Sequence, residues 1–492
     1  MQGWKGNMLA LIAGALMPLA FAPFFIYPLA IVSLAGLFLS WQQVSPKQAA
    51  WRGWLFGLGL FGVGVSWVFV AIHVFGQSGL LLAAFLTFLF VATLSLYLAG
   101  LGWLVKKLSP GMLTARDWLL LLPTGWLGFE LFKGWFLSGF PWLELGVSQI
   151  EGPLAGFVPL IGISGASLLV ALTAGLLLTA WQQRRALWLL PLLLIWGGGQ
   201  ALKPLNWTQA SGEPVDTTII QGNVPKQIKW QPEQLVNTLA LYQTMTRRHW
   251  DSDLVVWPEN ALPAFYHQLE DFYLTPLTEE ARDNKTDILL GLPVRDDDGV
   301  SYYNSMMVAG DSEGFYHKQH LVPFGDYVPF EWLRGLIAFF NLPMSAFVPG
   351  PAGQPLLEAA GHKVGISICY EDVFSSEVLQ TVPEAGLLVN ATNNAWYGDS
   401  FAPHQHLQIS RSRALETGRP LVRATTNGIS AFVDFKGRVM AQTPQFEKAA
   451  LTHSIQPRAG ETPYVSLQRW PIWLLSLLML LLWAYYRPKN SV

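Results

Sequence analysis

The sequence predicts a multi-span α-helical membrane domain of about eight transmembrane helices joined to an α/β domain. Hydrophobic residues make up 51% of the 492 residues and charged residues only 13%, whereas about 25% of a typical soluble protein is charged. Residues 1–200 are nearly continuous apolar segments broken by short turns. Residues 213–460 alternate short β-branched runs with helical stretches, which is typical of α/β layers.

Seven apolar segments precede the α/β domain and one follows it. About 20 apolar residues cross a bilayer as a helix, and fewer suffice where the bilayer thins. The N-terminal segment is interpreted as a retained span, because no clear cleavage site follows it and further apolar segments come at once. We expect a transmembrane domain over 1–200, an α/β domain over 213–460 and an eighth helix over 468–486. The expected spans in the first domain are 8–24, 26–41, 53–74, 80–105, 117–132, 160–181 and 186–200.

Basic residues collect in alternate loops between these segments, and such residues favour the cytoplasmic side of a membrane. The pattern predicts that both termini are cytoplasmic and that residues 201–467 lie in the periplasm of a bacterium, outside its inner membrane. A large buried helical core is the alternative for 1–200. The net charge of −2 gives no indication of a nucleic-acid partner. The basic residues of these loops and the C-terminal tail are Lys47, Arg52, Lys106, Lys107, Arg116, Arg184, Arg185, Arg487 and Lys489, whereas the other loops carry only Lys133.

Strand and helix signals alternate along 213–460. Leu235, Leu239 and Tyr242 recur at helical spacing, which predicts a helix within 231–250, and another helix is expected near 404–417. The stretch YYNSMMVAGDSEGFYHKQH predicts an additional hairpin with DSEG at its turn. The expected strands lie in DTTIIQGN, DLVVWPEN, DILLGLPV, YYNSMMVAG, KVGISICYE, GLLVNATNN and RPLVRATTNGISAFVDF.

Polar side chains stand at the ends of these strands, where ligands bind in open α/β sheets. Glu259 ends LVVWPE, Cys369 ends KVGISIC, and Lys318 stands beside a turn rich in Pro and Gly. Taken singly, each is more often structural, because a carboxylate at a strand end is commonly a cap and a lone cysteine commonly packs in the core.

Cys369 is the only cysteine of the chain, so it forms no intramolecular disulfide. The alternation of Ile366 and Ile368 places Cys369 on the opposite parity from the isoleucines, at the end of its strand. A helix is expected in DVFSSEVLQ directly after it. A thiol at a helix N-terminus has a lowered pKa, because the exposed N–H groups favour the thiolate. Cys369 is therefore a candidate nucleophile, and a nearby carboxylate is a candidate acceptor of its proton.

Three motifs around these residues resemble the signatures of the carbon–nitrogen hydrolase (nitrilase) superfamily. They are WPEN with Glu259, HKQHLVPFGDYVP with Lys318, and CYED with Cys369, in the same chain order as in that superfamily. The resemblance implies a nitrilase-like domain of the αββα sandwich type. Seven spans before it and one after it resemble the apolipoprotein N-acyltransferase family over essentially the whole chain, as do TNNAWYGDS and HQHLQISRSRALETGRPLVRATTNGIS.

The resemblance also implies a role for each site residue. Glu259 would be the general base, Cys369 the nucleophile, and Lys318 would stabilise the oxyanion together with the backbone N–H of Tyr370. Asp326 stands where the family commonly has Glu. The resemblance implies that it orients Lys318 or the catalytic Glu, with the same charge as Glu on a side chain one methylene shorter. Asn394 stands where the family usually has Asp, which indicates a structural position. Supporting positions match Trp230, Tyr370 and Glu371.

The reaction that the family implies is the last step of bacterial lipoprotein maturation. An acyl chain from a phospholipid, commonly phosphatidylethanolamine, passes through a thioester to the α-amine of the diacylglyceryl-modified N-terminal cysteine of an apolipoprotein. No cofactor is expected, since no His or Cys spacing suggests a zinc site and no glycine-rich phosphate loop occurs. The apolar stretch 324–350 predicts an amphipathic arm towards the membrane or a lid, or else core packing. The loop 131–146 has the same character.

Two other functions stay open at this point. A membrane-anchored amidase or nitrilase would use the same three residues but give the acyl group to water, although one span would suffice to anchor it. A transporter with a periplasmic binding module would need charged or broken segments near the middle of its spans, and these are scarce in residues 1–200.

Overall fold

The computed structural model describes residues 3–296, 298–328 and 347–486. Its contacts divide the chain into two compact units. The helical unit comprises Met1–Phe69, Gly79–Leu205 and Ser466–Val492, and the α/β unit comprises Val70–Ser78 and Asn206–Val465. The α/β unit therefore includes a short segment that the sequence assigns to the end of a span and an outer loop. Within that unit, Lys226 Nζ lies 5.3 Å from the centre of the Phe75 ring.

The helical unit contains an apolar helix in each of the eight segments predicted to span the membrane. Glycines allow the closest of these helices to touch. A Cβ at Gly53 of α3 would overlap the backbone of Leu98 in α5, and a Cβ at Gly57 would overlap Ser95, as expected where small residues let two helices approach closely. The helices are α1 (Trp4–Leu16), α2 (Pro28–Ser40), α3 (Pro46–Gly64), α5 (Leu80–Leu108), α6 (Leu122–Lys133), α7 (Val158–Gln183), α8 (Leu189–Leu202) and α17 (Trp470–Tyr485).

Few of these helices reach the length of a full span. By length and composition, two described helices could cross a membrane, Leu80–Leu108 and Pro153–Gln183, or three if the pair Pro46–Gly64 and Val68–Phe75, bent by 61°, counts as one span. The α1, α2, α8 and α17 helices have 13, 13, 14 and 16 residues, and at about 1.5 Å per residue they are shorter than a hydrocarbon core of about 30 Å. Topology with eight full spans stays a prediction.

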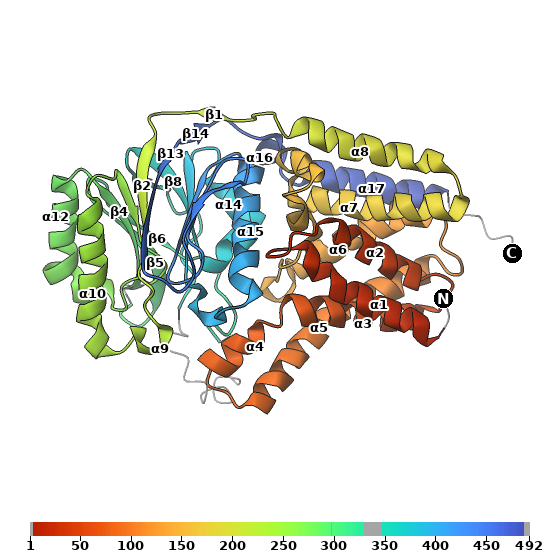
Figure 1. Ribbon diagram of the computed structural model, residues 1–492, viewed down its shortest axis with the longest axis horizontal. Helices are drawn as coiled ribbons and strands as arrows, with labels where there is room; N and C mark the ends of the chain where they lie inside the picture. Colours follow the sequence, from red (N-terminus) through yellow and green to blue (C-terminus); the bar gives the residue numbers. More distant parts are fainter. Residues whose placement is uncertain (1–2, 297, 329–346, 487–492) are drawn as a thin grey trace. The chain divides into compact units, whose positions relative to one another are not determined.

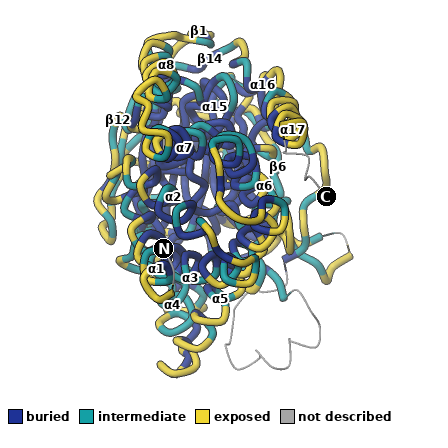
Figure 2. Tube along the Cα trace, turned by 90° about the vertical axis from the view of Figure 1, so that its right-hand side faces the viewer, coloured by how far each residue is buried: buried dark blue, intermediate teal, exposed yellow. Residues whose placement is uncertain are grey.

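Large apolar residues are exposed on several of these helices, and much of α17 is exposed (Figure 2). Only Ile472, Met479 and Trp483 of α17 are buried, and only Gly199 of α8 is buried. Large exposed apolar faces mark contact with a membrane or a partner. Together with the hydropathy of these helices, the exposed faces support association with a membrane.

Two basic residues that the charge pattern assigns to loops lie inside helices and are fully buried. Arg52 is in α3, where Nε donates to Asn7 Oδ1 at 3.2 Å and Nη1 donates to the carbonyl of Ser40. Lys106 is in the last turn of α5 and donates to the carbonyl of Gly111 at 2.6 Å. Helix ends leave carbonyls without intrahelical partners, and Arg52 binds such a carbonyl at the end of α2. Lys106 instead holds the loop that follows α5.

The α/β unit contains two six-stranded mixed sheets. The first has the order β13-β2-β3-β4-β5-β6 and the second β12-β11-β10-β9-β8-β7. In each, three neighbouring strands are parallel, β2-β3-β4 and β8-β9-β10, and the remaining pairs are antiparallel. The strands are β2 (Val215–Gln221), β3 (Leu254–Val256), β4 (Asp287–Arg295), β5 (Tyr302–Ala309), β6 (Gly314–His317), β7 (Leu357–Ala359), β8 (His362–Ile368), β9 (Leu387–Thr392), β10 (Leu421–Thr425), β11 (Ala431–Val433), β12 (Val439–Gln442) and β13 (Ala449–Ile455). The predicted hairpin is confirmed as β5 and β6, with Ser305 opposite His317.

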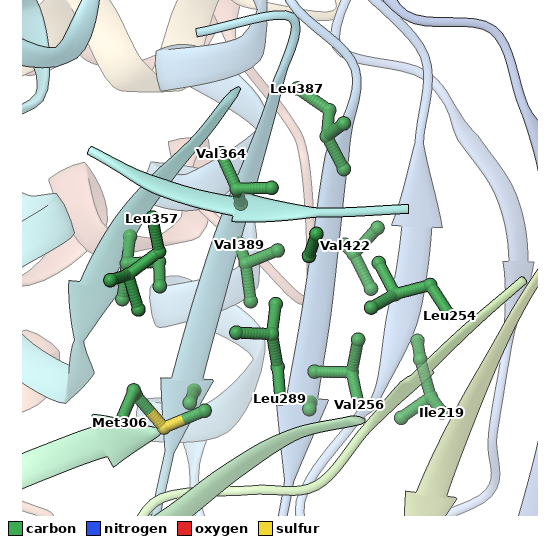
Figure 3. Close-up of a cluster of buried hydrophobic side chains, with 14 of the residues drawn as sticks. Ile219, Leu254, Val256, Leu289, Met306, Leu357, Val364, Leu387, Val389 and Val422 are labelled. Carbon is green, nitrogen blue, oxygen red and sulfur yellow. The ribbon is translucent and has the colours of Figure 1, made fainter. Parts of the chain in front are cut away.

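The two sheets pack face to face between helices, as predicted for an αββα sandwich. Side chains of both sheets fill the layer between them, among them Val256, Leu289, Val364 and Val389 (Figure 3). Helices α10 (Pro232–Thr246) and α12 (Thr275–Asp283) cover the outer face of the first sheet, and α15 (Phe401–Thr417) covers that of the second (Figure 1). Ile366 and Ile368 belong to the layer between the sheets, so the strand that carries Cys369 is fixed by packing on its apolar side.

Candidate active site

Glu259 and Lys318 meet in the α/β unit, although they stand on different strand ends. Glu259 follows β3 by three residues, and Lys318 directly follows β6. Lys318 Nζ lies 3.5 Å from Glu259 Oε1, and both side chains are buried. Cys369 directly follows β8 of the other sheet, close enough for the charges of both residues to act on its thiol. The structure therefore brings together the three residues that the motifs single out.

The backbone of Cys369 is in the left-handed region, with φ at 54°. That conformation costs a residue with a side chain about 1–2 kcal/mol, and strain of this kind collects at functional sites. The predicted helix after Cys369 is wrong as one element. The chain forms a 3-10 helix over Cys369–Val373, breaks at an extended Phe374, and then forms a helix of only four residues, Ser375–Val378.

The thiol of Cys369 has a raised pKa, not the lowered pKa predicted from a helix N-terminus. Burial raises the pKa of Cys369 to about 12, repulsion from Glu259 adds to the rise, and attraction to Lys318 opposes it. The short helical turns after Cys369 supply little dipole compared with the cost of burying a thiolate. A protonated thiol requires a base for attack, and Glu259 is the carboxylate placed beside it.

Glu259 is held by both sheets. Asn304 Nδ2, on β5, donates to Oε1 at 2.7 Å, and the backbone N–H of Asn393, after β9, donates to Oε2 at 2.8 Å. These two hydrogen bonds fix the plane of the carboxylate, so the orientation of Glu259 is set from both sheets.

Lys318 is held between two carboxylates. Its Nζ donates to Asp326 Oδ2 at 2.8 Å, and the same oxygen accepts from the backbone N–H of Val322 at 2.8 Å. Burial alone would lower the pKa of Lys318, but attraction to Asp326, Glu259 and Cys369 raises it well above the usual value. Lys318 therefore stays an ammonium, and Asp326 orients it despite being shorter than the Glu common in the family.

The loop that carries Asp326 is closed at its base. The N–H of Phe347 donates to the carbonyl of Asp326 at 3.1 Å, and the N–H of Gly350 donates to the carbonyl of Lys318 at 2.8 Å. These two bonds join the ends of the apolar stretch 324–350 beside Lys318. Most of the predicted amphipathic arm, residues 329–346, lies outside the described residues.

Glu371 connects the turn of Cys369 to the loop of Lys318. Its carboxylate accepts from the N–H of Ile368 at 2.6 Å, from the N–H groups of Gln319 and His320 at 2.6 and 3.2 Å, and from the hydroxyl of Tyr316 at 3.1 Å. Burial raises the pKa of Glu371 to about 7, against the effect of the backbone donors. The side chain bridges two strand ends and makes no direct contact with the reacting thiol in these bonds.

The two remaining predicted residues differ in their placement. Tyr370 is buried and packs edge-on against Phe374, with ring centres 5.2 Å apart. Trp230 ends the helix α9 (Lys226–Lys229) and is half-buried. Within the described part of the chain, none of the hydrogen bonds that hold Glu259 or Lys318 comes from the Trp230 side chain. The supporting role of Trp230 therefore stays a prediction.

Sequence reasoning missed three residues that shape the site. Asn304 is a buried amide inside the alternating pattern of YYNSMMVAG, which was a signal that could have found it. Tyr316 lies on the hairpin strand before Lys318 and gave no signal. Lys229 is buried beside Trp230, and burial lowers its pKa to about 8 while attraction to Glu259 opposes the change. Among the residues that the structure describes, no group of three or more His, Cys, Asp or Glu side chains is placed to hold a metal ion.

Comparison with known proteins gives matches over both units. The family model described as the apolipoprotein N-acyltransferase N-terminal domain matches residues 13–176, and the carbon-nitrogen hydrolase model matches residues 217–464. Apolipoprotein N-acyltransferases of Methylococcus capsulatus and Azotobacter vinelandii are 46% and 45% identical to the chain, covering 95% and 99% of it and 93% and 96% of their own lengths. A solved carbon-nitrogen hydrolase from Helicobacter pylori is 16% identical, with a TM-score of 0.38, over 56% of this chain and 95% of its own.

Proposed function

The chain belongs to the apolipoprotein N-acyltransferase family, and we propose on that premise that Cys369 carries the transferred acyl chain as a thioester. The enzyme is a membrane-bound bacterial acyltransferase that N-acylates lipoproteins, with a lipid as donor. The observation that carries the proposal is the buried contact of Glu259 with Lys318 at 3.5 Å, beside a thiol at a strand end. The donor is a phospholipid, in the first instance phosphatidylethanolamine.

In the first half-reaction Glu259 removes the thiol proton and the sulfur of Cys369 attacks an ester carbonyl of the phospholipid. The carbonyl oxygen becomes an oxyanion, stabilised by the ammonium of Lys318 and the backbone N–H of Tyr370. The C–O bond of the ester then breaks, and Glu259 returns its proton to the departing alkoxide. Lysophospholipid leaves, and the acyl chain remains on Cys369.

In the second half-reaction the α-amine of the diacylglyceryl-cysteine of an apolipoprotein attacks the thioester. The same two donors stabilise the oxyanion. Glu259 takes a proton from the attacking amine, and the sulfur of Cys369 leaves and is reprotonated. The products are an N-acyl amide and the free thiol. A dry site protects the thioester from water, which fits the burial of Glu259 and Lys318.

The membrane topology is part of the proposal. All eight apolar helices lie in the inner membrane, both termini are cytoplasmic, and the catalytic domain over 213–460 lies in the periplasm between the seventh and eighth helices. Alternating basic loops and the exposed apolar faces of α8 and α17 support this arrangement. The loop 131–146 of the helical unit offers an apolar surface to lipid, since Trp135 and Leu137 are 74% and 68% exposed. Both substrates are lipid-anchored and reach the site from the bilayer.

Intact-mass measurement tests the proposal. The purified enzyme is incubated with phosphatidylethanolamine vesicles, next to a Cys369→Ser variant. The wild type is expected to gain the mass of one acyl chain, lost on addition of a diacylated lipopeptide with a free α-amine, and the variant is expected to gain none. Because the chain has a single cysteine, a thioester has only one place to form. Turnover of small amides without a lipid adduct would instead identify a membrane-anchored amidase.

A further inference from the structure

The carbonyl oxygen of Cys369 is held by two buried side chains that the reaction does not use. Asn390 Nδ2 lies 3.3 Å from this oxygen and His406 Nε2 lies 3.2 Å from it. Asn390 is on β9 and His406 is on α15, and both side chains are fully buried. Two donors from two different elements therefore converge on one carbonyl of the strained turn.

The hydrogen-bond pattern fixes the tautomer of His406. Its Nε2 faces two acceptors, the Cys369 carbonyl and Asp372 Oδ1 at 2.8 Å, so Nε2 carries the proton. Its Nδ1 lies 3.3 Å from Asn394 Nδ2. The amide oxygen of Asn394 accepts from Arg423 Nη2 at 3.1 Å, which fixes Nδ2 as the atom that faces the ring. Nδ1 is therefore an acceptor and the ring is neutral. Burial lowers the pKa of His406, which favours the same form.

Asn390 has only one orientation that satisfies its neighbours. Its Oδ1 accepts from Arg423 Nη1 at 2.5 Å, because a guanidinium can only donate. Its Nδ2 then points to Ser367 Oγ at 3.0 Å and to the Cys369 carbonyl. Arg423 thus sets the amide of Asn390 directly and, through Asn394, the ring of His406. We call Asn390, His406, Asp372, Asn394 and Arg423 the anchoring network.

A held carbonyl also fixes the N–H on the other side of the same peptide. Among the described residues, cis peptide bonds occur only at Ala22–Pro23 and Val382–Pro383, so the peptide between Cys369 and Tyr370 is trans. In a planar trans peptide the C=O and the N–H point in opposite directions. Donors that hold the Cys369 carbonyl on the buried side therefore turn the Tyr370 N–H away from that side.

We propose that His406 and Asn390 are positioning residues, which hold the Cys369 carbonyl so that the Tyr370 N–H faces the oxyanion of the acyl-transfer reaction. This inference rests on the proposed thioester mechanism. It gives the left-handed turn of Cys369 a role, because rotation of that peptide towards an unstrained conformation would remove the N–H donor. Neither side chain touches the substrate.

Two reactions of the same thiol separate positioning from general damage. Acylation of Cys369 by a fluorescent phosphatidylethanolamine passes through an oxyanion, whereas alkylation by iodoacetamide does not. His406→Leu is expected to slow acylation about 100-fold, the cost of one oxyanion donor, and to leave alkylation within about threefold. His406→Gln is expected to recover most of the rate, because its amide can donate from nearly the position of Nε2. His404→Leu, a half-buried neighbour on α15, is the matched control and should change neither rate.

Asn390→Ala provides a second variant if His406→Leu fails to fold. The variant loses one of the two donors to the Cys369 carbonyl, and the remaining donor should keep the Tyr370 N–H partly aligned. Acylation should therefore slow about tenfold, and the alkylation rate should stay unchanged. Unchanged acylation in a folded variant overturns the inference, and so does an equal loss of both rates without recovery in His406→Gln. If wild-type enzyme forms no thioester at all, the proposed function fails, which is a different result from any of these.

Discussion

Two buried polar groups flank Cys369 and differ in their net charge. The catalytic cluster, Glu259, Lys318 and Asp326, sets two carboxylates against one ammonium. The anchoring network sets the carboxylate of Asp372 against the guanidinium of Arg423, 3.5 Å apart, with His406 neutral. One group therefore has a surplus negative charge and the other has none, although each pairs carboxylate with cation.

The difference separates two ways of acting on a thiol. An unbalanced charge acts through space in a low-dielectric interior. Burial is the main cause of the raised pKa of Cys369, and repulsion from the charge of Glu259 raises it further. The uncharged members of the network, His406 and Asn390, act on Cys369 through hydrogen bonds to its backbone. Removing a charge from the cluster should alter the thiol pKa, and replacing His406 or Asn390 should not.

Glu259→Gln should give the largest effect and the sharpest contrast. Acylation is expected to slow about 1,000-fold, because the general base is lost. The thiol pKa is expected to fall, because repulsion from Glu259 contributes to its rise. Iodoacetamide should therefore alkylate the variant faster than the wild type at the same pH, while phospholipid acylates it more slowly. Both rates are measured on the single cysteine by intact mass.

Glu270→Gln is a matched control, since Glu270 carries the same charge on the outer helical layer of the α/β unit. It should change neither rate. Slower alkylation in Glu259→Gln would contradict the expected result, because it would mean that Glu259 promotes loss of the thiol proton more than its charge opposes the thiolate.

Asp326→Asn should have an intermediate effect. Lys318 Nζ loses its shortest contact, the 2.8 Å bond to a carboxylate oxygen, and is free to move towards Glu259. Acylation is expected to slow about tenfold, since the oxyanion donor is displaced and not removed. The thiol pKa should fall slightly, because Asp326 also contributes to its rise. The rate constants are measured as for Glu259→Gln.

Asp326→Glu restores the charge and tests the missing methylene. Recovery to within about threefold of the wild-type acylation rate is expected, because a longer carboxylate can still reach Lys318. Full activity in Asp326→Asn would show that Glu259 alone orients the lysine, and the cluster would then be smaller than described.

Much of this arrangement could be predicted from the sequence. Local patterns predict three features of the site. They are the strand ends at Glu259 and Cys369, the β5–β6 hairpin before Lys318, and the apolar side of the strand formed by Ile366 and Ile368. An apolar helix in each of eight segments follows from hydropathy, but the lengths do not, because the break near Val65–Trp67 bends the third segment by 61°.

What the sequence could not give depends on tertiary burial. The helix expected after Cys369 is interrupted at Phe374. Burial of the thiol raises its pKa, and no local sequence pattern indicates that burial. Asn304 and His406 come from strands and helices far along the chain, and their partners are visible only in three dimensions. The anchoring network was out of reach for the same reason.

Tyr316→Phe should give the smallest effect, and it decides with which group Glu371 belongs. The variant removes one of four donors to this carboxylate, at a cost of about 1 kcal/mol, or about 2–4 °C in thermal unfolding. Tyr303→Phe, which removes a 2.9 Å bond to Asp296 just after the neighbouring strand β4, should cost a similar amount without slowing acylation. If Tyr316→Phe slows acylation severalfold with the alkylation rate unchanged, Glu371 acts by position, like the neutral network. If the alkylation rate changes as well, the charge of Glu371 acts on the thiol. Glu371 then belongs to the catalytic cluster as its third carboxylate.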